Sequence, residues 1–277
     1  FEVVKTNIIG AQNLIEAAIH CNVKKVIALS TDKAANPVNL YGATKLCSDK
    51  MFTASNNYSG TSGPTFSVLR YGNVLGSRGS VVPFFMKERE KGVLSITDFE
   101  MTRFWITLRQ AATFVLRCLE EMHGAETFVP KIPSMKIVDM ARALAPECKL
   151  IETGIRPGEK LHETMIPSDD AERTFEFDDY YVVAPSYAPD EFCELFKRLG
   201  GKPVEKRFAY SSDTNKQWLT GDQLNRLLSD GAENSTTNNK LNIVVVREGQ
   251  DESDRQVLPS LEQQYTKSLK ISSKLTN

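Results

Sequence analysis

Short apolar runs alternate with amphipathic segments along the first hundred residues, and this alternation constrains the fold more than any other feature. Apolar residues recur at helical spacing over 4–18, and 26–29 follows as an apolar run typical of a buried strand. Residues 41–58 predict a second helix and 66–69 a second strand. Strands that alternate with helices predict an α/β fold with a doubly wound parallel sheet.

The pattern changes after about Ile106, where the expected elements become shorter and more mixed. Thr107 and Gln110 match a capping box ahead of an apolar stripe, and Ser134 is predicted to cap a helix that ends near 145. The sequence therefore predicts a division into 1–106, the main sheet with the catalytic residues, and 107–230, mainly a smaller C-terminal α/β lobe that binds substrate and is interleaved with the first part.

Polar residues dominate the last segment. Residues 231–277 begin with a run poor in apolar side chains, which predicts a flexible tail. Only 243–246 could form a strand there. The chain starts at Phe1 within a helical pattern, with no strand and glycine loop before it, so it reads as lacking the N-terminal strands of its sheet. We then expect an unpaired, apolar sheet edge.

Composition excludes several classes of function. The net charge of −1 gives no reason to expect nucleic acid or an anionic membrane as a partner, and no run approaches about 18 apolar residues. The five cysteines are scattered without a C-x-x-C pair, which favours unpaired thiols in a reducing, cytoplasmic compartment. The three histidines show no metal-ligand spacing, so no metal site is expected.

Two proton-transfer pairs lie close together around the predicted strand 26–29. Asp32 and Lys33 follow directly at its carboxyl end, where open α/β sheets bind ligands. Tyr41 and Lys45 lie four residues apart and share one helix face, and an ammonium beside a phenol favours the phenolate. Two such pairs beside one site indicate acid/base chemistry on adjacent atoms of a single substrate.

The block V-I-A-L-S-T-D-K-A-A-N-P-V-N-L-Y-G-A-T-K at 26–45 resembles the extended short-chain dehydrogenase/reductase superfamily. Within that superfamily the chain resembles the inverting UDP-N-acetylglucosamine 4,6-dehydratases. The other matching motifs are R-Y-G-N-V-L-G-S-R-G-S at 70–80, I-T-D at 96–98, M-T-R-F-W-I-T at 101–107, F-V-P-K-I-P-S at 128–134 and I-R-P-G-E-K-L-H-E at 155–163. The family's N-terminal glycine-rich nucleotide fingerprint is not found in the sequence.

The resemblance implies a Rossmann-like fold and a lyase that holds NADP tightly and recycles it. Tyr41 would remove the O4 proton, Lys33 the C5 proton as a neutral amine of lowered pKa, and Asp32 would protonate the departing C6 hydroxyl. Lysine at 33 is the feature that indicates inversion at C5. Thr31 and Lys45 complete the implied catalytic group, and Tyr41, Lys45 and Val74 the implied cofactor contacts.

The implied product is a UDP-4-keto-6-deoxy-L-arabino-hexulose for bacterial nonulosonate, flagellin-glycan or capsule synthesis, made by a homo-oligomer. Planar guanidinium groups and amide donors suit a diphosphate. The implied contacts to the UDP-sugar are Asn73, Arg78, Gly79, Ser80, Val81, Val82, Thr97, Arg103, Arg156 and Glu159.

Two alternatives stay open on the residues. A nucleotide-sugar 4-epimerase of the same superfamily would need Tyr41 and Lys45 but not Asp32 and Lys33. An inactive remnant would follow if the missing glycine loop leaves the chain without its cofactor, and we expect the chain by itself to be inactive for that reason.

Overall fold

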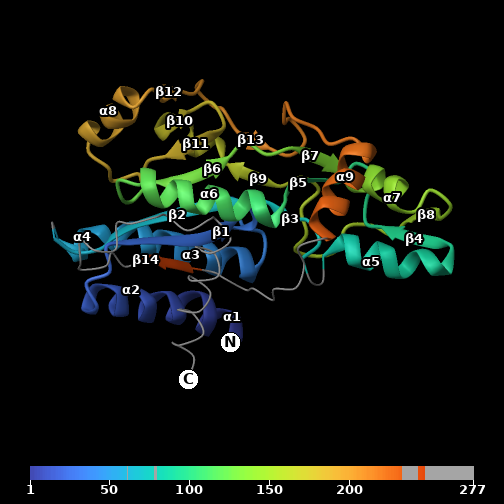
Figure 1. Ribbon diagram of the computed structural model, residues 1–277, viewed down its shortest axis with the longest axis horizontal. Helices are drawn as coiled ribbons and strands as arrows, with labels where there is room; N and C mark the ends of the chain where they lie inside the picture. Colours follow the sequence, from blue (N-terminus) through green and yellow to red (C-terminus); the bar gives the residue numbers. More distant parts are fainter. Residues whose placement is uncertain (61, 78–79, 233–242, 247–277) are drawn as a thin grey trace, which may run out of the picture. The chain divides into compact units, whose positions relative to one another are not determined.

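The computed structural model describes residues 1–60, 62–77, 80–232 and 243–246. In this part of the chain the largest sheet has the strand order β12-β10-β11-β6-β2-β1-β14 (Figure 1). Its strands are β1 (Lys25–Thr31), β2 (Thr65–Tyr71), β6 (Thr127–Pro130), β10 (Thr174–Glu176), β11 (Tyr180–Val183), β12 (Lys202–Pro203) and β14 (Ile243–Val246).

The centre of this sheet is parallel, as the alternating pattern predicts. β1 pairs with β2 and β2 with β6 in parallel, whereas β11, β10, β12 and β14 add antiparallel pairs at the two sides. In the β1–β2 register Thr31 lies opposite Tyr71. The residues that follow β1 and β2 therefore emerge at the same edge of the sheet.

Helices cover both faces, so the sheet is doubly wound (Figure 1). The helix α2 (Gly10–His20) and the helix α3 (Leu40–Ala54) pack on the face that carries Val26, Ala28 and Val68. The helix α6 (Leu108–Glu121) covers the opposite face, against Ile27 and Leu69. Successive strand residues thus enter different cores, which explains why these central strands are apolar throughout.

A second core lies in a smaller α/β lobe. The strands β4 (Val93–Ile96) and β8 (Lys149–Glu152) pair in parallel, and Leu94 and Ile96 pack with residues of three helices. These helices are α5 (Val81–Glu88), α7 (Ile137–Leu144) and α9 (Gly221–Ala232). The lobe draws on residues from both sides of 106, while β6, β10, β11 and β12 of the main sheet come from beyond 106, so the two segments are interleaved.

The remaining elements are short. They are α1 (Glu2–Val4), the π-helical η1 (Lys5–Ile9), η2 (Asp32–Ala34), α4 (Asn56–Ser59), β3 (Asn73–Val74), η3 (Arg89–Lys91), β5 (Thr102–Ile106), β7 (Ser134–Lys136), β9 (Thr164–Ile166), η4 (Ser168–Arg173), α8 (Asp190–Arg198) and β13 (Tyr210–Ser211). The capping box predicted at Thr107 and Gln110 is present at the start of α6.

Ser134 does not cap a helix, contrary to the prediction. It begins β7, which pairs antiparallel with β5, and α7 starts three residues later at Ile137. The Ser134 hydroxyl is fully buried and accepts a hydrogen bond from Asn215 Nδ2 at 3.0 Å. The hydroxyl that was predicted to cap the helix is thus bonded to a side chain 81 residues away in the sequence.

The expected open edge at β1 is also not found. β14 pairs antiparallel with β1 from Lys25↔Val246 to Ala28↔Ile243. The run 243–246 thereby supplies backbone partners at that edge. The rest of the predicted flexible tail, apart from 231–232, lies outside the described residues.

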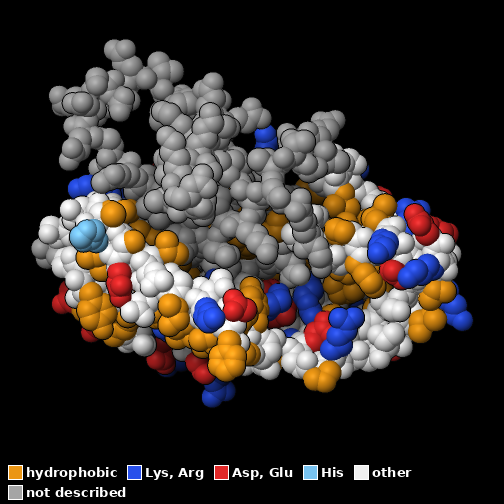
Figure 2. Space-filling view, turned by 90° about the horizontal axis from the view of Figure 1, so that it is seen from below, with side chains coloured by type: hydrophobic (Ala, Val, Ile, Leu, Met, Phe, Trp, Pro, Cys, Tyr) orange, Lys and Arg blue, Asp and Glu red, His pale blue; other side chains and the backbone are white. Residues whose placement is uncertain are grey.

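Charged side chains of both signs are interspersed on the face seen in Figure 2, with hydrophobic side chains between them. This agrees with the near-zero net charge. No helix in the described part of the chain is both long and apolar enough to cross a membrane. The five cysteines, all of which are described, are unpaired.

Candidate active site

The catalytic loop begins where β1 ends. Thr31 is extended and its Oγ1 accepts a bond from the Lys33 amide at 3.4 Å, so it caps the single turn η2. The same hydroxyl donates to Asp32 Oδ1 at 2.8 Å. Thr31 therefore fixes both the backbone turn and the carboxylate that follows it.

The helix α3 begins a few residues later, with Asn39 as its N-cap. Asn39 Oδ1 accepts from the Gly42 amide at 2.8 Å, which places Tyr41 in the first turn and Lys45 one turn on. Gly42 lies so close to the catalytic loop that a Cβ there would be 2.3 Å from the Lys33 carbonyl oxygen. The glycine thus lets the helix that carries Tyr41 approach the loop that carries Lys33.

Asp32 and Lys33 form an ion pair with 3.0 Å between Nζ and Oδ1. The Asp32 side chain is 0% exposed, whereas that of Lys33 is 35% exposed. Burial lowers the pKa of Lys33, but the charges of Asp32 and Glu163 and the Asp32 hydrogen bond outweigh it, so the pKa is raised. The prediction of a lowered pKa for Lys33 is therefore wrong.

Tyr41 and Lys45 also differ from the expectation of a phenolate stabilised by Lys45. Partial burial raises the pKa of Tyr41, and the cation that opposes this rise is Lys33. Lys45 is buried and donates from Nζ to the Leu29 carbonyl at 2.7 Å, and its own pKa is lowered by burial. The cation that lowers the pKa of the Tyr41 phenol is therefore Lys33 of the catalytic loop.

A buried polar network lies behind this helix. Asp49, one turn beyond Lys45, accepts from Ser30 Oγ at 2.6 Å and is 3.3 Å from Arg70 Nη2. Arg70 Nη1 donates to the Met165 carbonyl at 2.8 Å. The network joins β1, α3, β2 and β9 directly behind the catalytic loop.

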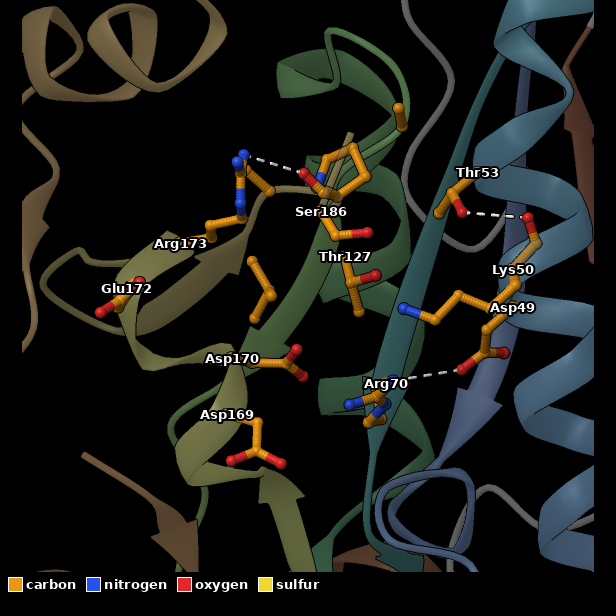
Figure 3. A pocket seen from close by; sticks show the side chains of 14 residues that line it. Asp49, Lys50, Thr53, Arg70, Thr127, Asp169, Asp170, Glu172, Arg173 and Ser186 are labelled. Carbon is orange, nitrogen blue, oxygen red and sulfur yellow. Dashed lines mark hydrogen bonds and ion pairs between the residues drawn. The ribbon is translucent and has the colours of Figure 1, made fainter. Parts of the chain in front are cut away.

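The network borders a cavity of about 140 Å³ on the α3 side of the main sheet. Figure 3 shows Asp49 and Lys50 reaching in from α3, Arg70 from β2, and Asp169 and Asp170 from η4. None of the predicted catalytic residues lines this cavity. Asp49 and Arg70, which line it, belong to the buried network behind the catalytic loop.

The segment 154–163 folds over the catalytic loop. Asn39 Nδ2 donates to the Gly158 carbonyl at 2.8 Å, and Lys160 Nζ donates to the Ala35 carbonyl at 2.6 Å. Glu163, at the end of this segment, is buried and acts on the pKa of Lys33. Residues some 120 positions apart are in this way brought to one site.

Arg103 does not present the free guanidinium expected for a diphosphate. It is buried, and its Nη atoms donate to the carbonyls of Thr102, Lys160 and Leu161 at 2.7–2.9 Å. Glu159 lies 3.6 Å from its Nη2. Arg156, in contrast, is exposed.

The other predicted substrate residues surround β3 and the start of α5. Asn73 and Val74 form β3 and pair with Trp105 and Ile106 of β5. Within the described residues, Asn73 Oδ1 and Ser80 Oγ are buried polar atoms with no hydrogen-bond partner. Val81 and Val82 form the first turn of α5, Thr97 follows β4 and is partly buried, and Arg78 and Gly79 lie outside the described residues.

Sequence reasoning missed Glu163 and Asp49 as members of the site. Asp49 could have been found, because it continues the Tyr41–Lys45 helix face by one more turn. Glu163 lies in the matched motif at 155–163 but carried no assigned role. In the described chain no group of three or more His, Cys, Asp or Glu side chains could hold a metal ion.

A doubly wound sheet with Tyr41 and Lys45 on the helix beside the carboxyl end of β1 defines the extended short-chain dehydrogenase/reductase class. The family model described as polysaccharide biosynthesis protein matches residues 1–185. The chain belongs to that family.

Two relatives from Campylobacter jejuni are both named UDP-N-acetylglucosamine 4,6-dehydratase (inverting). One, from strain 81-176, is 56% identical over 229 residues, covering 80% of this chain and 69% of its own length. The other, from strain NCTC 11168, is 54% identical over 82% of this chain and 70% of its own length. The solved structure of Pen from Bacillus thuringiensis superposes with a TM-score of 0.72 at 35% identity, covering 83% of this chain and 69% of that one.

Proposed function

We propose that this chain carries the active site of a UDP-N-acetylglucosamine 4,6-dehydratase that inverts C5. The observation that carries the proposal is the buried Asp32–Lys33 pair at the carboxyl end of β1, on the loop against which the Tyr41 helix packs. The names of the two Campylobacter relatives support it at 54–56% identity.

The polar groups near β1 and β3 fit the nicotinamide half of an NADP cofactor. Among the described residues, the Tyr41 phenol makes no hydrogen bond, and Lys45 uses one of its donors, to the Leu29 carbonyl. Tyr41 and Lys45 would hold the nicotinamide ribose, and Val74 would border the ring. When bound, a nicotinamide cofactor would accept a hydride from sugar C4 and later return it to C6.

Each protein residue then has one proton to move or hold. Tyr41 takes the proton from the sugar O4, and the Lys45 ammonium beside it on α3 orients the reacting groups. The resulting 4-keto group acidifies C5, from which Lys33 would take a proton once the proton that the pair shares lies on the Asp32 carboxylate. Asp32 would then give that proton to the departing C6 hydroxyl, which leaves as water, and a proton would return to C5 from the opposite face, which inverts it.

The UDP part of the substrate would lie along β3, the start of α5 and the segment 154–163. Asn73 and Ser80 offer buried polar atoms without partners, and Arg156 offers an exposed guanidinium. Arg78, Gly79, Val81, Val82, Thr97, Arg103 and Glu159 complete the proposed substrate contacts. Since Arg103 is already bonded to carbonyls, its part would be to hold the segment 159–161 in place.

The proposal extends to the setting of the enzyme. We place it in bacterial nonulosonate, flagellin-glycan or capsule synthesis, as a homo-oligomer. A cytoplasmic location is supported by the five unpaired cysteines, because a reducing compartment keeps thiols free.

A nucleotide-sugar 4-epimerase is disfavoured by the same pair of residues. Epimerisation exchanges the hydride at C4 and needs Tyr41 and Lys45 only. It gives no task to a buried carboxylate and an amine held 3.0 Å apart beside the tyrosine.

The test is the product that the protein, loaded with its nicotinamide cofactor, forms from UDP-N-acetylglucosamine in deuterated water. We expect NMR to show a 4-keto-6-deoxy sugar with deuterium at C5 and the inverted configuration. Retention of the gluco configuration at C5, or a 4-epimer with its C6 hydroxyl, would contradict the proposal.

A substitution separates the two half-reactions. Lys33→Ala should stop elimination and C5 exchange but spare oxidation at C4, so that reduced cofactor accumulates in a single turnover. Lys24→Ala removes an exposed lysine at the opposite end of β1 and should behave as wild type. Unchanged C5 exchange in Lys33→Ala would remove Lys33 as the base.

A further inference from the structure

Two side-chain hydrogen bonds attach the segment 154–163 to the catalytic loop. From the loop, Asn39 Nδ2 donates to the Gly158 carbonyl at 2.8 Å. From the segment, Lys160 Nζ donates to the buried Ala35 carbonyl at 2.6 Å. Both loop residues lie between the two proton-transfer pairs in the sequence. The segment is therefore attached at two points to the stretch of loop that connects these pairs.

Asn39 makes two hydrogen bonds that serve different purposes. Its Oδ1 accepts from the Gly42 amide at 2.8 Å and caps α3, the helix of Tyr41. Its Nδ2 bonds a residue 119 positions further along the chain. Capping needs only a side-chain oxygen, which serine or aspartate also provides, whereas asparagine adds an amide donor beside that oxygen. The bond to Gly158 therefore gives the amide nitrogen a function that capping does not.

Gly158 lies in a tight turn that is shaped for this contact. The Glu159 amide donates to the Arg156 carbonyl at 3.1 Å, which closes the turn 156–159. Proline at its second position and glycine with φ of +79° at its third are the signature of a type II turn. A Cβ on Gly158 would be 3.3 Å from Asn39 Cβ, closer than an ordinary contact. Because the turn is closed, the Gly158 carbonyl and Arg156 move together.

We propose that Asn39 is a positioning residue that docks the turn 156–159 on the catalytic loop, so that Arg156 is held ready for the diphosphate of the substrate. The inference rests on the proposed function, which places the diphosphate at this segment and the proton transfers on the loop. A substrate that spans both needs them at a fixed separation, because a misplacement of about 1 Å is costly in rate. Lys160 supplies the second attachment.

The placement of the turn depends strongly on such bonds. Residues 151–158 are all exposed, so burial contributes little to holding them in place. If the turn is docked only part of the time, the apparent dissociation constant of the substrate rises by the inverse of the docked fraction. The bound substrate then restores docking, so the bound complex reacts as before. Loss of the Asn39 bond should therefore raise KM and spare kcat.

The test is Asn39→Asp in the full chain, loaded with its nicotinamide cofactor. Aspartate keeps the capping oxygen and suits a helix N-terminus, but it lacks the amide donor for Gly158. We expect KM for UDP-N-acetylglucosamine to rise about tenfold with kcat within about twofold of wild type, and the urea midpoint not to fall. Asn39→Ser, an uncharged cap, should show the same split, which separates the lost bond from the added charge.

A glycine pair tests the contact from the other side. Gly158→Ala should also raise KM about tenfold, because the methyl group displaces Asn39. Gly92→Ala is the matched control, since Gly92 has a similar φ of +69° but a Cβ there would meet no atom within 4 Å. It should keep the wild-type KM and kcat. Combining Asn39→Ser with Gly158→Ala should raise KM no further, because both changes break one contact.

Hydrogen exchange measured by NMR gives a readout that does not need turnover. The Glu159 amide should exchange faster in Asn39→Asp and Gly158→Ala, while the Gly42 amide stays protected in Asn39→Asp. A KM within about twofold of wild type in both variants would overturn the inference, as would unchanged Glu159 exchange. If the wild type forms no dehydrated product, the proposed function fails, while the exchange of Glu159 still decides whether Asn39 docks the turn.

Discussion

Replacing Gly42 with alanine tests how closely the chemistry depends on the contact between α3 and the catalytic loop. A Cβ at this position would be 2.3 Å from the Lys33 carbonyl oxygen and 3.0 Å from Pro37 Cβ, whereas ordinary contacts begin at 3.4 Å. The difference, 3.4 − 2.3 = 1.1 Å, is the distance by which the loop and the helix must separate. The Lys33 carbonyl oxygen is a backbone atom, and Pro37 Cβ belongs to a ring closed on the backbone. Neither atom can rotate away, so the turn η2 must move.

The expected loss of activity is larger than the loss of stability. A misplacement of about 1 Å can cost roughly 100-fold in rate, which is about 2.7 kcal/mol of transition-state free energy. Strain from the added methyl group costs about 1–3 kcal/mol of unfolding free energy, and the better helix propensity of alanine returns about 1 kcal/mol. The protein should therefore fold with most of its stability while turnover falls about 100-fold.

The assay measures dehydration of UDP-N-acetylglucosamine together with urea unfolding of the same preparation. Gly10→Ala is the matched control, because its Cβ would meet only the Lys5 carbonyl, at an ordinary 3.5 Å, in the helix α2. This control should keep its activity and gain up to about 1 kcal/mol of stability. The Ala35 amide donates to the backbone carbonyl of Asp32, so its hydrogen exchange reports the movement of η2 directly.

Turnover of Gly42→Ala within about twofold of the control would refute the reasoning, since it would show that the loop absorbs the movement without misplacing Lys33. A parallel loss of activity and stability would also contradict it, because the effect would then be a loss of folded protein.

Three further predictions concern stability. Asp49→Asn should destabilise the protein by about 3–5 kcal/mol in urea unfolding, because it leaves the buried Arg70 guanidinium without its counter-charge; the loss should largely vanish when Arg70→Met is added. Thr107→Ala should cost about 1 kcal/mol by removing the cap that bonds the Gln110 amide, and a loss below a few tenths would contradict that role. Burial raises the pKa of Glu126, so its contribution to stability is full below the unfolded-state pKa and declines as pH rises through the higher folded-state value. Unfolding of Glu126→Gln, measured from acid to neutral pH, should therefore show a smaller decline than wild type, and equal declines would refute this account.

The sequence by itself determined the fold class and the local geometry of the catalytic loop. Apolar periodicity over stretches of ten to twenty residues predicts α2, β1, α3 and β2, and these elements are present. The spacing of Tyr41 and Lys45 places them one helical turn apart, and adjacency pairs Asp32 with Lys33. Each of these features depends on neighbours within a few residues, so local pattern is sufficient to predict it.

Only the tertiary structure decided the electrostatics of the site. Burial lowers the pKa of Lys33, but the adjacent Asp32 charge and then Glu163, from a segment 130 positions away (163 − 33 = 130), raise it more. Arg103 donates its hydrogen bonds to the carbonyls of 160 and 161. Ser134 likewise gives its hydroxyl to Asn215 and joins a strand. Charge interactions and burial depend on distance in space, which the order of residues does not contain, so the state of each ionisable group follows only once the chain is folded.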